Sequence, residues 1–123
     1  MPALNILLID DNPIEFHLID RMLKEEFKEE YILRYASSLD KAKSVLKTQS
    51  PDVILIDFNF GRDLFALGFV AALKAIDSKV PMILISNEVN AGYLTDKVLL
   101  NVYDIVDKFQ LRKRIAAGLL KAL

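Results

Sequence analysis

Short hydrophobic runs alternate with longer stretches of mixed character along this chain of 123 residues. Five runs predict strands, over 4–9, 31–35, 53–56, 82–85 and 103–106. Between them, hydrophobic residues recur three and four positions apart, which is typical of helices with one buried face. Regular alternation of strand and helix indicates βα units built around a parallel sheet. We therefore expect a single α/β domain that spans residues 1–123.

Capping signals mark the start of the first two helices. Asn12 and Pro13 open the first, because a polar cap followed by proline favours a helix start. Ser38 caps the second, which we expect to end at Lys47. The run at 31–35 contains a charged residue and is therefore expected at an edge of the sheet. Three more helices are expected over 68–76, 93–100 and 110–120, the first of them after a long irregular segment at 58–65.

The balance of charge and the lack of cysteine narrow the function classes. The formal net charge is −1, so long-range attraction to nucleic acid or to an anionic membrane is not expected. Without cysteine there is no disulfide, no thiolate zinc site and no cysteine nucleophile. No hydrophobic run approaches the roughly 20 residues of a membrane-spanning helix, and no signal peptide is evident. We therefore expect a cytoplasmic protein that binds neither nucleic acid nor membrane.

Polar residues of different kinds stand where the hydrophobic runs stop. Asp10 and Asp11 follow the first run, Asp57 ends the third, Ser86 ends the fourth, and Lys108 lies just beyond the fifth. Sites in open parallel sheets form beyond the carboxyl ends of the strands. We therefore expect these side chains to meet at one edge of the sheet.

Such a set of side chains suits a divalent cation together with a phosphoryl group. Clustered carboxylates repel one another, and at least one tends to keep its proton unless a cation removes the penalty. Mg²⁺ prefers oxygen ligands and combines one or two carboxylates with phosphate oxygens. The Lys108 ammonium can pair with one phosphoryl oxygen, and the Ser86 hydroxyl can donate to another. Asp57 ends the most central run and is the best candidate for a nucleophile that becomes an aspartyl phosphate, with Asp10 and Asp11 placed to hold the metal.

The chain resembles the response-regulator receiver domain, the phosphoacceptor module of two-component signal transduction. The resemblance rests on Leu-Leu-Ile-Asp-Asp at 7–11, Val-Ile-Leu-Ile-Asp at 53–57, Val-Pro-Met-Ile-Leu-Ile-Ser at 80–86 and Asp-Lys at 107–108. It covers essentially the whole chain, and the order and spacing of the motifs together are specific. It implies a CheY-like, flavodoxin-like (βα)5 fold, a three-layer sandwich whose parallel five-stranded sheet has the order 2-1-3-4-5.

The resemblance also implies a magnesium site. Asp11 would be a direct ligand of Mg²⁺, and Asp10 would bind the ion through water. Asp57 and the main-chain carbonyl of Asn59 would complete the protein's share of the ligands.

The same resemblance implies how phosphorylation proceeds. Asp57 would accept the phosphoryl group from a phosphohistidine of a sensor histidine kinase or a phosphotransfer protein, while Ser86 and Lys108 contact that group. The side chains of Asn59 and Glu88 match positions that tune the lifetime of the phosphorylated state. Receiver domains often pair through the face made by the fourth helix, fifth strand and fifth helix, so a homodimer through this face is an alternative to a monomer.

Several residues depart from the family pattern. Phe109 replaces the proline that usually follows the lysine in a cis linkage, and we expect a trans bond because a cis bond without proline costs roughly 3 kcal/mol. Ile105 replaces the aromatic switch residue, and Asn87 replaces the small residue after the serine. The helix-opening glycine, Gly68, falls later than usual, and the usual proline in the preceding loop is Gly61. The acceptor residues are intact, whereas those that relay phosphorylation are altered.

These departures leave two alternatives to a phosphorylation switch. The first is a degenerate receiver that acts as a phosphorylation-independent scaffold for protein interactions. The second is a magnesium-dependent phosphohydrolase, since Asp57-Phe58-Asn59 loosely resembles the Asp-x-Asp motif of such enzymes. The second carboxylate of that motif is missing here, so we expect slow self-dephosphorylation and no independent substrate.

Overall fold

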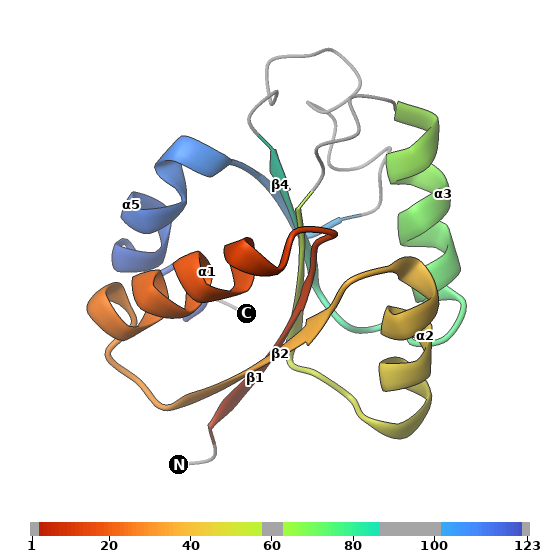
Figure 1. The fold of residues 1–123 in the computed structure, drawn as a ribbon, viewed down its shortest axis with the longest axis horizontal. Helices are drawn as coiled ribbons and strands as arrows, with labels where there is room; N and C mark the ends of the chain where they lie inside the picture. Colours follow the sequence, from red (N-terminus) through yellow and green to blue (C-terminus); the bar gives the residue numbers. More distant parts are fainter. Residues whose placement is uncertain (1–2, 58–62, 87–101, 122–123) are drawn as a thin grey trace.

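Five parallel strands form one sheet in the part of the chain that the structure describes (Figure 1). The computed structural model describes residues 3–57, 63–86 and 102–121, with the backbone alone described at 63–67. The strands are β1 (Leu4–Ile9), β2 (Tyr31–Ala36), β3 (Val53–Asp57), β4 (Met82–Ser86) and β5 (Asp104–Asp107). Their order is β2-β1-β3-β4-β5, and all four pairings are parallel. The predicted fold and strand order are confirmed.

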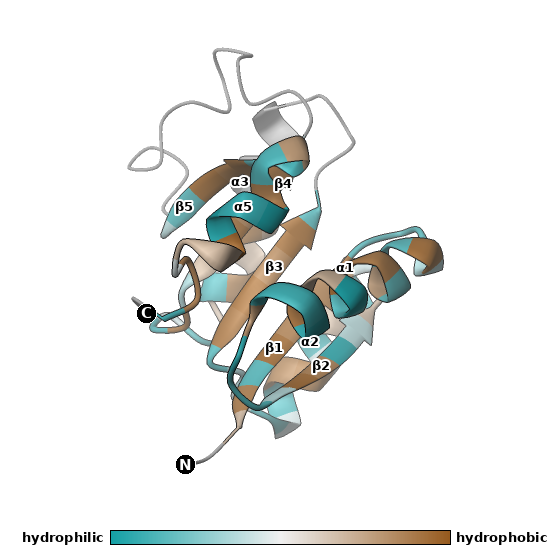
Figure 2. Cartoon of the chain, turned by 90° about the vertical axis from the view of Figure 1, so that its left-hand side faces the viewer, coloured by the Kyte–Doolittle hydropathy of each residue, from teal (hydrophilic) through white to brown (hydrophobic). Residues whose placement is uncertain are grey.

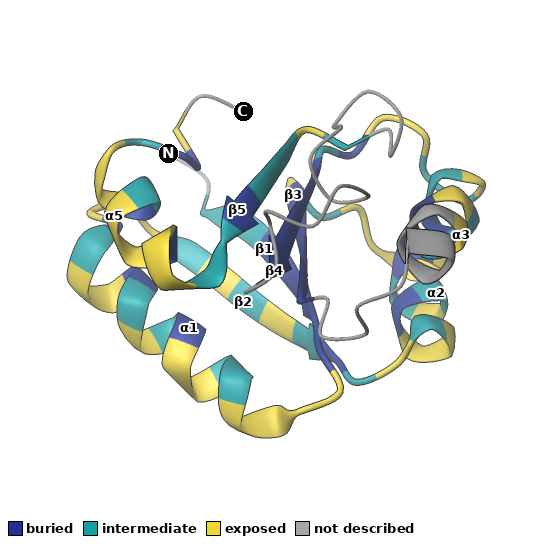
Figure 3. Ribbon diagram, turned by 90° about the horizontal axis from the view of Figure 1, so that it is seen from above, coloured by how far each residue is buried: buried dark blue, intermediate teal, exposed yellow. Residues whose placement is uncertain are grey.

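Helices cover both faces of this sheet. They are α1 (Pro13–Glu26), α2 (Leu39–Thr48), α3 (Asp63–Lys74) and α5 (Leu111–Ala116), the last preceded by the short 3-10 turn η2 (Lys108–Gln110). Helices α1 and α5 lie on one face and α2 and α3 on the other, as Figures 1 and 3 show. The helix expected at 93–100 lies outside the described residues. No helix in the described ranges combines the length and hydrophobicity needed to cross a bilayer.

Strand side chains alternate between two hydrophobic clusters, one on each face of the sheet. Because successive residues of a strand point to opposite faces, Leu7, Ile54 and Leu84 pack toward α2 and α3, whereas Leu8 and Leu55 pack toward α1 and α5. The central strands β3 and β4 are buried over their whole length, which Figure 3 shows in dark blue. In Figure 2 the central strand β3 is coloured as hydrophobic along its length, whereas the helices carry both hydrophobic and hydrophilic residues. Strand β2, as expected of an edge, exposes Ile32 and Arg34.

The caps of the first two helices form as the sequence predicts. Asn12 accepts a hydrogen bond from the backbone N–H of Ile14 at 3.1 Å, and Pro13 is the first helical residue. The Ser38 hydroxyl accepts from the backbone N–H of Lys41 at 3.2 Å. These caps fix where α1 and α2 begin, at the same edge of the sheet as the ends of β1 and β2.

Two helix boundaries differ from the prediction by more than two residues, and both involve glycine. Helix α3 begins at Asp63 and not at Gly68, which lies inside it, because a helix interior tolerates a glycine at a cost of about 1 kcal/mol. Helix α5 ends at Ala116, whereas the expected helix continued to residue 120. Gly118 takes a positive φ of 103°, and the Leu119 N–H donates to the Arg114 carbonyl at 2.9 Å. This arrangement is a Schellman motif, which ends a helix by satisfying its last carbonyls.

Candidate functional site

An acidic cleft lies where the carboxyl ends of the central strands meet. Asp10 directly follows β1, Asp57 ends β3 and Ser86 ends β4, and all three are at most 4% exposed. The sheet register aligns Asp57 with Ile85, the neighbour of Ser86. The parallel topology therefore brings these polar residues to one edge of the sheet, as expected.

Lys108 reaches this cleft from the turn that follows β5. Its Nζ lies 3.0 Å from Asp57 Oδ2 and 2.8 Å from Glu15 Oε1. The Asp57 side chain is fully buried, and those of Lys108 and Glu15 are 22% and 13% exposed. The ammonium thus bridges a carboxylate of the sheet and a carboxylate of α1.

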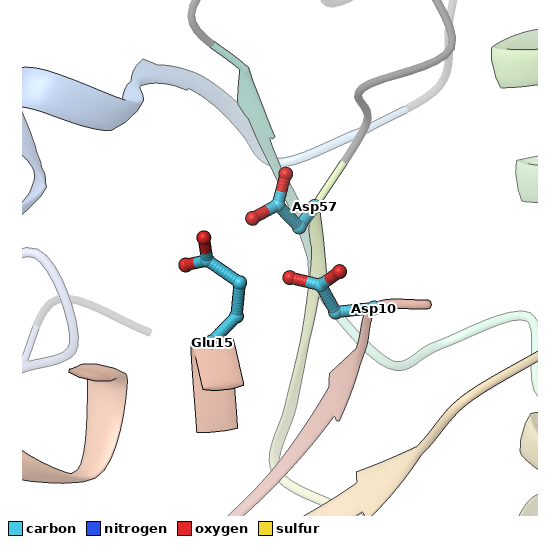
Figure 4. Close-up of side chains that lie close together, drawn as sticks. All are labelled: Asp10, Glu15 and Asp57. Carbon is cyan, nitrogen blue, oxygen red and sulfur yellow. The ribbon is translucent and has the colours of Figure 1, made fainter. Parts of the chain in front are cut away.

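Three carboxyl groups face one another around the cleft (Figure 4). They belong to Asp10, Glu15 and Asp57, and one oxygen of each lies within 4.8 Å of the others. Asp10 Oδ2 and Asp57 Oδ1 are buried and have no hydrogen-bond partner among the described residues. Buried carboxylate oxygens without a partner are costly, and they are also the ligands that Mg²⁺ prefers. The residues present therefore fit a divalent cation.

Burial changes the ionisation of Asp10. Loss of solvent raises the pKa of its carboxyl group to about 8, and the neighbouring Asp57 and Glu15 carboxylates act in the same direction. The backbone N–H of Asn12, which donates to Asp10 Oδ1 at 2.9 Å, opposes the rise in pKa only in part. Asp10 therefore keeps its proton at neutral pH in the metal-free cleft, as expected for one member of a carboxylate cluster.

Lys108 stays positively charged in this environment. Burial lowers the pKa of its ammonium, but the contacts with Glu15 and Asp57 outweigh burial and raise the pKa above the usual value for lysine. The side chain can therefore act as a fixed positive charge beside Asp57.

The remaining predicted residues either lie apart from this cluster or fall outside the residues that the structure describes. Asp11 is exposed in the turn after β1 and does not belong to the close carboxylate cluster. It lines, with Asp10, Asp57 and Phe69, a neighbouring pocket of about 240 Å³. Its role as a direct metal ligand stays a prediction. Asn59, Asn87 and Glu88 lie outside the described residues.

Two residues that shape the cleft are not among those predicted from the sequence. The first is Glu15, which the Asn12-Pro13 helix start places at the third helical position, where a glutamate often points back toward the helix start. Tyr35, on the edge strand β2, donates its hydroxyl to the Asp10 main-chain carbonyl at 2.7 Å. Burial, followed by the charges of Asp10 and Asp11, raises the pKa of Tyr35. Only the strand pairing, which sets Ile9 opposite Ala36, brings this tyrosine to the acidic turn.

Comparison with known families identifies the family to which this domain belongs. Residues 6–119 match the model of the response regulator receiver domain. The chain belongs to this family. No curated protein sequence matches it. The protein is thus a response regulator receiver domain of the kind used in two-component signalling, and its cleft lies where the family motifs converge.

Solved receiver structures share the fold at low sequence identity. The receiver domain of a sensor histidine kinase from Pseudomonas aeruginosa PAO1, which has a magnesium ion in its active-site cleft, is 20% identical over 98% of this chain and 97% of that chain, with a TM-score of 0.75. The chemotaxis response regulator CheY4 of Vibrio cholerae is 16% identical over 99% of this chain and 100% of that chain, with a TM-score of 0.78. A response regulator from Burkholderia pseudomallei, solved with a phosphorylated aspartic acid and a calcium ion, is 21% identical over 95% of this chain and 66% of that chain, with a TM-score of 0.74.

This receiver departs from the family pattern around Lys108. The peptide bond to Phe109 is trans, as predicted, and the Phe109 side chain is 78% exposed. The Asp107 carboxylate accepts from the Phe109 N–H at 2.9 Å and caps the 3-10 turn. Ile105 packs, partly buried, against the cluster beneath α2 and α3. The turn that carries Lys108 is therefore held by a side-chain cap.

The two arginines of α5 pair with acidic residues of the same molecule. Arg112 contacts Glu25 and Glu26 of α1 at 3.1 and 3.4 Å, and Arg114 pairs with Asp104 of β5. The predicted homodimer face includes the fourth helix, which lies outside the described residues, so the homodimer stays a prediction.

Proposed function

We propose that this receiver accepts a phosphoryl group on Asp57 from a phosphohistidine of a sensor histidine kinase or a phosphotransfer protein. The observation that carries the proposal is the contact of the Lys108 ammonium with the buried Asp57 carboxylate at 3.0 Å, in a cleft that also holds buried Asp10. An acceptor needs a carboxylate beside a positive charge, because the charges of the two reacting groups otherwise repel one another.

The chemistry is a single displacement at phosphorus. An oxygen of Asp57 forms a bond to phosphorus while the bond from phosphorus to the donor's imidazole nitrogen breaks, and that nitrogen keeps the electron pair. Lys108 pairs with a phosphoryl oxygen as a fixed charge, and the Ser86 hydroxyl donates to another. Asp10, Asp11, Asp57 and the Asn59 carbonyl are the proposed ligands of Mg²⁺, which supplies charge neutralisation of the carboxylates and the phosphoryl oxygens when it is bound.

Two fold neighbours support the assignment. One receiver was solved with magnesium in its active-site cleft, and another response regulator carries a phosphorylated aspartic acid. The carboxylate cluster of this chain offers the same kind of ligands. We also propose slow self-dephosphorylation without an independent substrate, with Asn59 and Glu88 as residues that set its rate.

The test is incubation of the purified protein with Mg²⁺ and a small phosphodonor such as acetyl phosphate, followed by intact mass measurement. We expect the mass to rise by one phosphoryl group and Asp57→Asn to abolish the increase. Asp52→Asn is the matched control, because Asp52 precedes the same strand at its opposite end, where it accepts from the Asn5 N–H. It should be modified like the unsubstituted protein.

The alternative of a phosphorylation-independent scaffold makes the opposite prediction. Ile105, Asn87 and Phe109 motivate it, since all three depart from the family pattern at positions that relay phosphorylation. A folded protein that gains no mass with Mg²⁺ and phosphodonor would favour this alternative. Multiple turnover of a simple phosphate ester would instead favour a phosphohydrolase.

A further inference from the structure

Among the described carboxylates of the cleft, Glu15 is the one to which the proposed function gives no role. It lies on the first turn of α1, and its Oε1 is 2.8 Å from the Lys108 ammonium. This contact is slightly shorter than the 3.0 Å contact between the same ammonium and Asp57. In the part of the chain that the structure describes, Lys108 therefore has two anionic partners, one on each side of the cleft.

We propose that Glu15 is a second anchor for Lys108, a positioning residue that competes with the incoming phosphoryl group for the lysine ammonium. The inference rests on the proposed function, because it concerns the same lysine and the same acceptor. It assigns to Glu15 a regulatory effect on the rate of phosphorylation.

Local structure fixes Glu15 where it can hold the lysine. Pro13 and the Asn12 cap set the start of α1, and the Glu15 N–H donates to the Asn12 carbonyl at 3.1 Å. Helix α1 packs against α5, where Arg112 contacts Glu25 and Glu26, so the first turn of α1 keeps its place beside the turn that carries Lys108. Figure 4 shows the Glu15 carboxylate directed at the Asp57 carboxylate.

Burial makes this contact stronger than an ordinary surface ion pair. The Glu15 and Lys108 side chains are only 13% and 22% exposed, so water screens their attraction less than at the surface. An ammonium has three N–H donors, and in Lys108 the contacts with Glu15 and Asp57 occupy two of them. A phosphoryl group on Asp57 would extend beyond the present position of Oδ2, and Lys108 has to rearrange to reach its oxygens.

Charge is the second reason for competition. Glu15 carries a negative charge close to the position where the phosphoryl oxygens arrive, and its nearest oxygen lies within 4.8 Å of an Asp57 oxygen. It therefore repels the phosphodonor while it holds the cation that the phosphoryl group needs. Removal of this charge should release Lys108 and weaken the repulsion together.

The test compares Glu15→Gln, which is nearly isosteric but neutral, with the unsubstituted protein. The matched control is Glu29→Gln, which changes the net charge equally at an exposed position beyond the opposite end of α1. The first measurement is the ¹H–¹⁵N signal of the Lys108 ammonium without phosphodonor, identified by its loss in Lys108→Arg. The second is the phosphorylation rate with acetyl phosphate at Mg²⁺ concentrations that saturate each variant.

We expect Glu15→Gln to shift the Lys108 signal and to raise the phosphorylation rate by more than about threefold, which is the scale of one exposed ion pair. Glu29→Gln should change neither. An unchanged Lys108 signal, or a rate that stays the same or falls, would overturn the inference. A loss of Mg²⁺ affinity in Glu15→Gln as large as in Asp10→Asn would also overturn it, because Glu15 would then be a metal ligand.

Failure of the proposed function gives a different result. The unsubstituted protein would then gain no phosphoryl group at all, and the Lys108 signal of the unmodified protein would still show whether Glu15 anchors the lysine. If the unsubstituted protein and Glu15→Gln were phosphorylated at the same rate, the proposed function would stand and only the role of Glu15 would be contradicted.

Discussion

Asp10 shows how burial and charge act on a single residue of the cleft. Its carboxyl group is 2% exposed and lies beside Asp57 and Glu15. The sequence alone indicated that one of the clustered carboxylates would keep its proton, because like charges repel. It did not identify which one, since the answer depends on how deeply each side chain is buried after folding.

The raised pKa of Asp10 predicts how the stability of the metal-free protein depends on pH. Burial and the neighbouring carboxylates raise this pKa from 3.8 to about 8, so between these values the folded state holds a proton that the unfolded state has lost. The free energy of unfolding should therefore fall as the pH rises from about 4 to about 8. Asp10→Asn should remove this contribution and stabilise the protein at pH 7.5 by several kcal/mol, because each unit of pKa shift corresponds to about 1.4 kcal/mol.

Urea unfolding in the presence of a chelator, at several pH values across this range, measures the effect. The difference between Asp10→Asn and the unsubstituted protein should grow with pH. A constant difference would show that Asp10 has an ordinary pKa in the folded state.

At the scale of elements, the sequence predicts strands better than helix ends. The hydrophobic runs of β1, β3 and β4 stand out because central strands are buried on both faces, and the Asn12 and Ser38 caps are local signals that need no tertiary contact. Glycine is ambiguous from sequence, because it can lie inside a helix or end one. Gly68 lies within α3, whereas Gly118 follows the end of α5.

This difference predicts opposite effects for the same substitution. Gly118→Ala should destabilise the protein by about 1–2 kcal/mol, because the positive φ of 103° is unfavourable for a residue with a Cβ atom. Gly68→Ala should stabilise it by up to about 1 kcal/mol, because alanine favours a helix interior more than glycine does. Among the described residues, no atom beyond the local backbone lies within 4 Å of the added Cβ at either site, so we expect backbone preference to decide both.

Thermal unfolding of the two variants under identical conditions is the measurement. Opposite shifts of Tm are expected. Shifts of the same sign would contradict the helix ends described for α3 or α5.

At the scale of the whole molecule, the strand order creates the site. Residues far apart in sequence meet because parallel strands present their carboxyl ends at one edge of the sheet, which is why Asp10, Asp57, Ser86 and Lys108 could be predicted together. Glu15 could not be assigned in the same way. Its contact depends on how α1 packs beside the turn after β5, a tertiary relation that no local pattern records.

The central claim is that Asp57 receives the phosphoryl group in this cleft. Its most direct test is to treat the protein with Mg²⁺ and acetyl phosphate, reduce the product with borohydride, and map the peptides by mass spectrometry, because reduction converts an aspartyl phosphate into homoserine. We predict homoserine at position 57 alone, and only in samples that contained both Mg²⁺ and the phosphodonor. Homoserine at another aspartate, with Asp57 unchanged, would contradict this account.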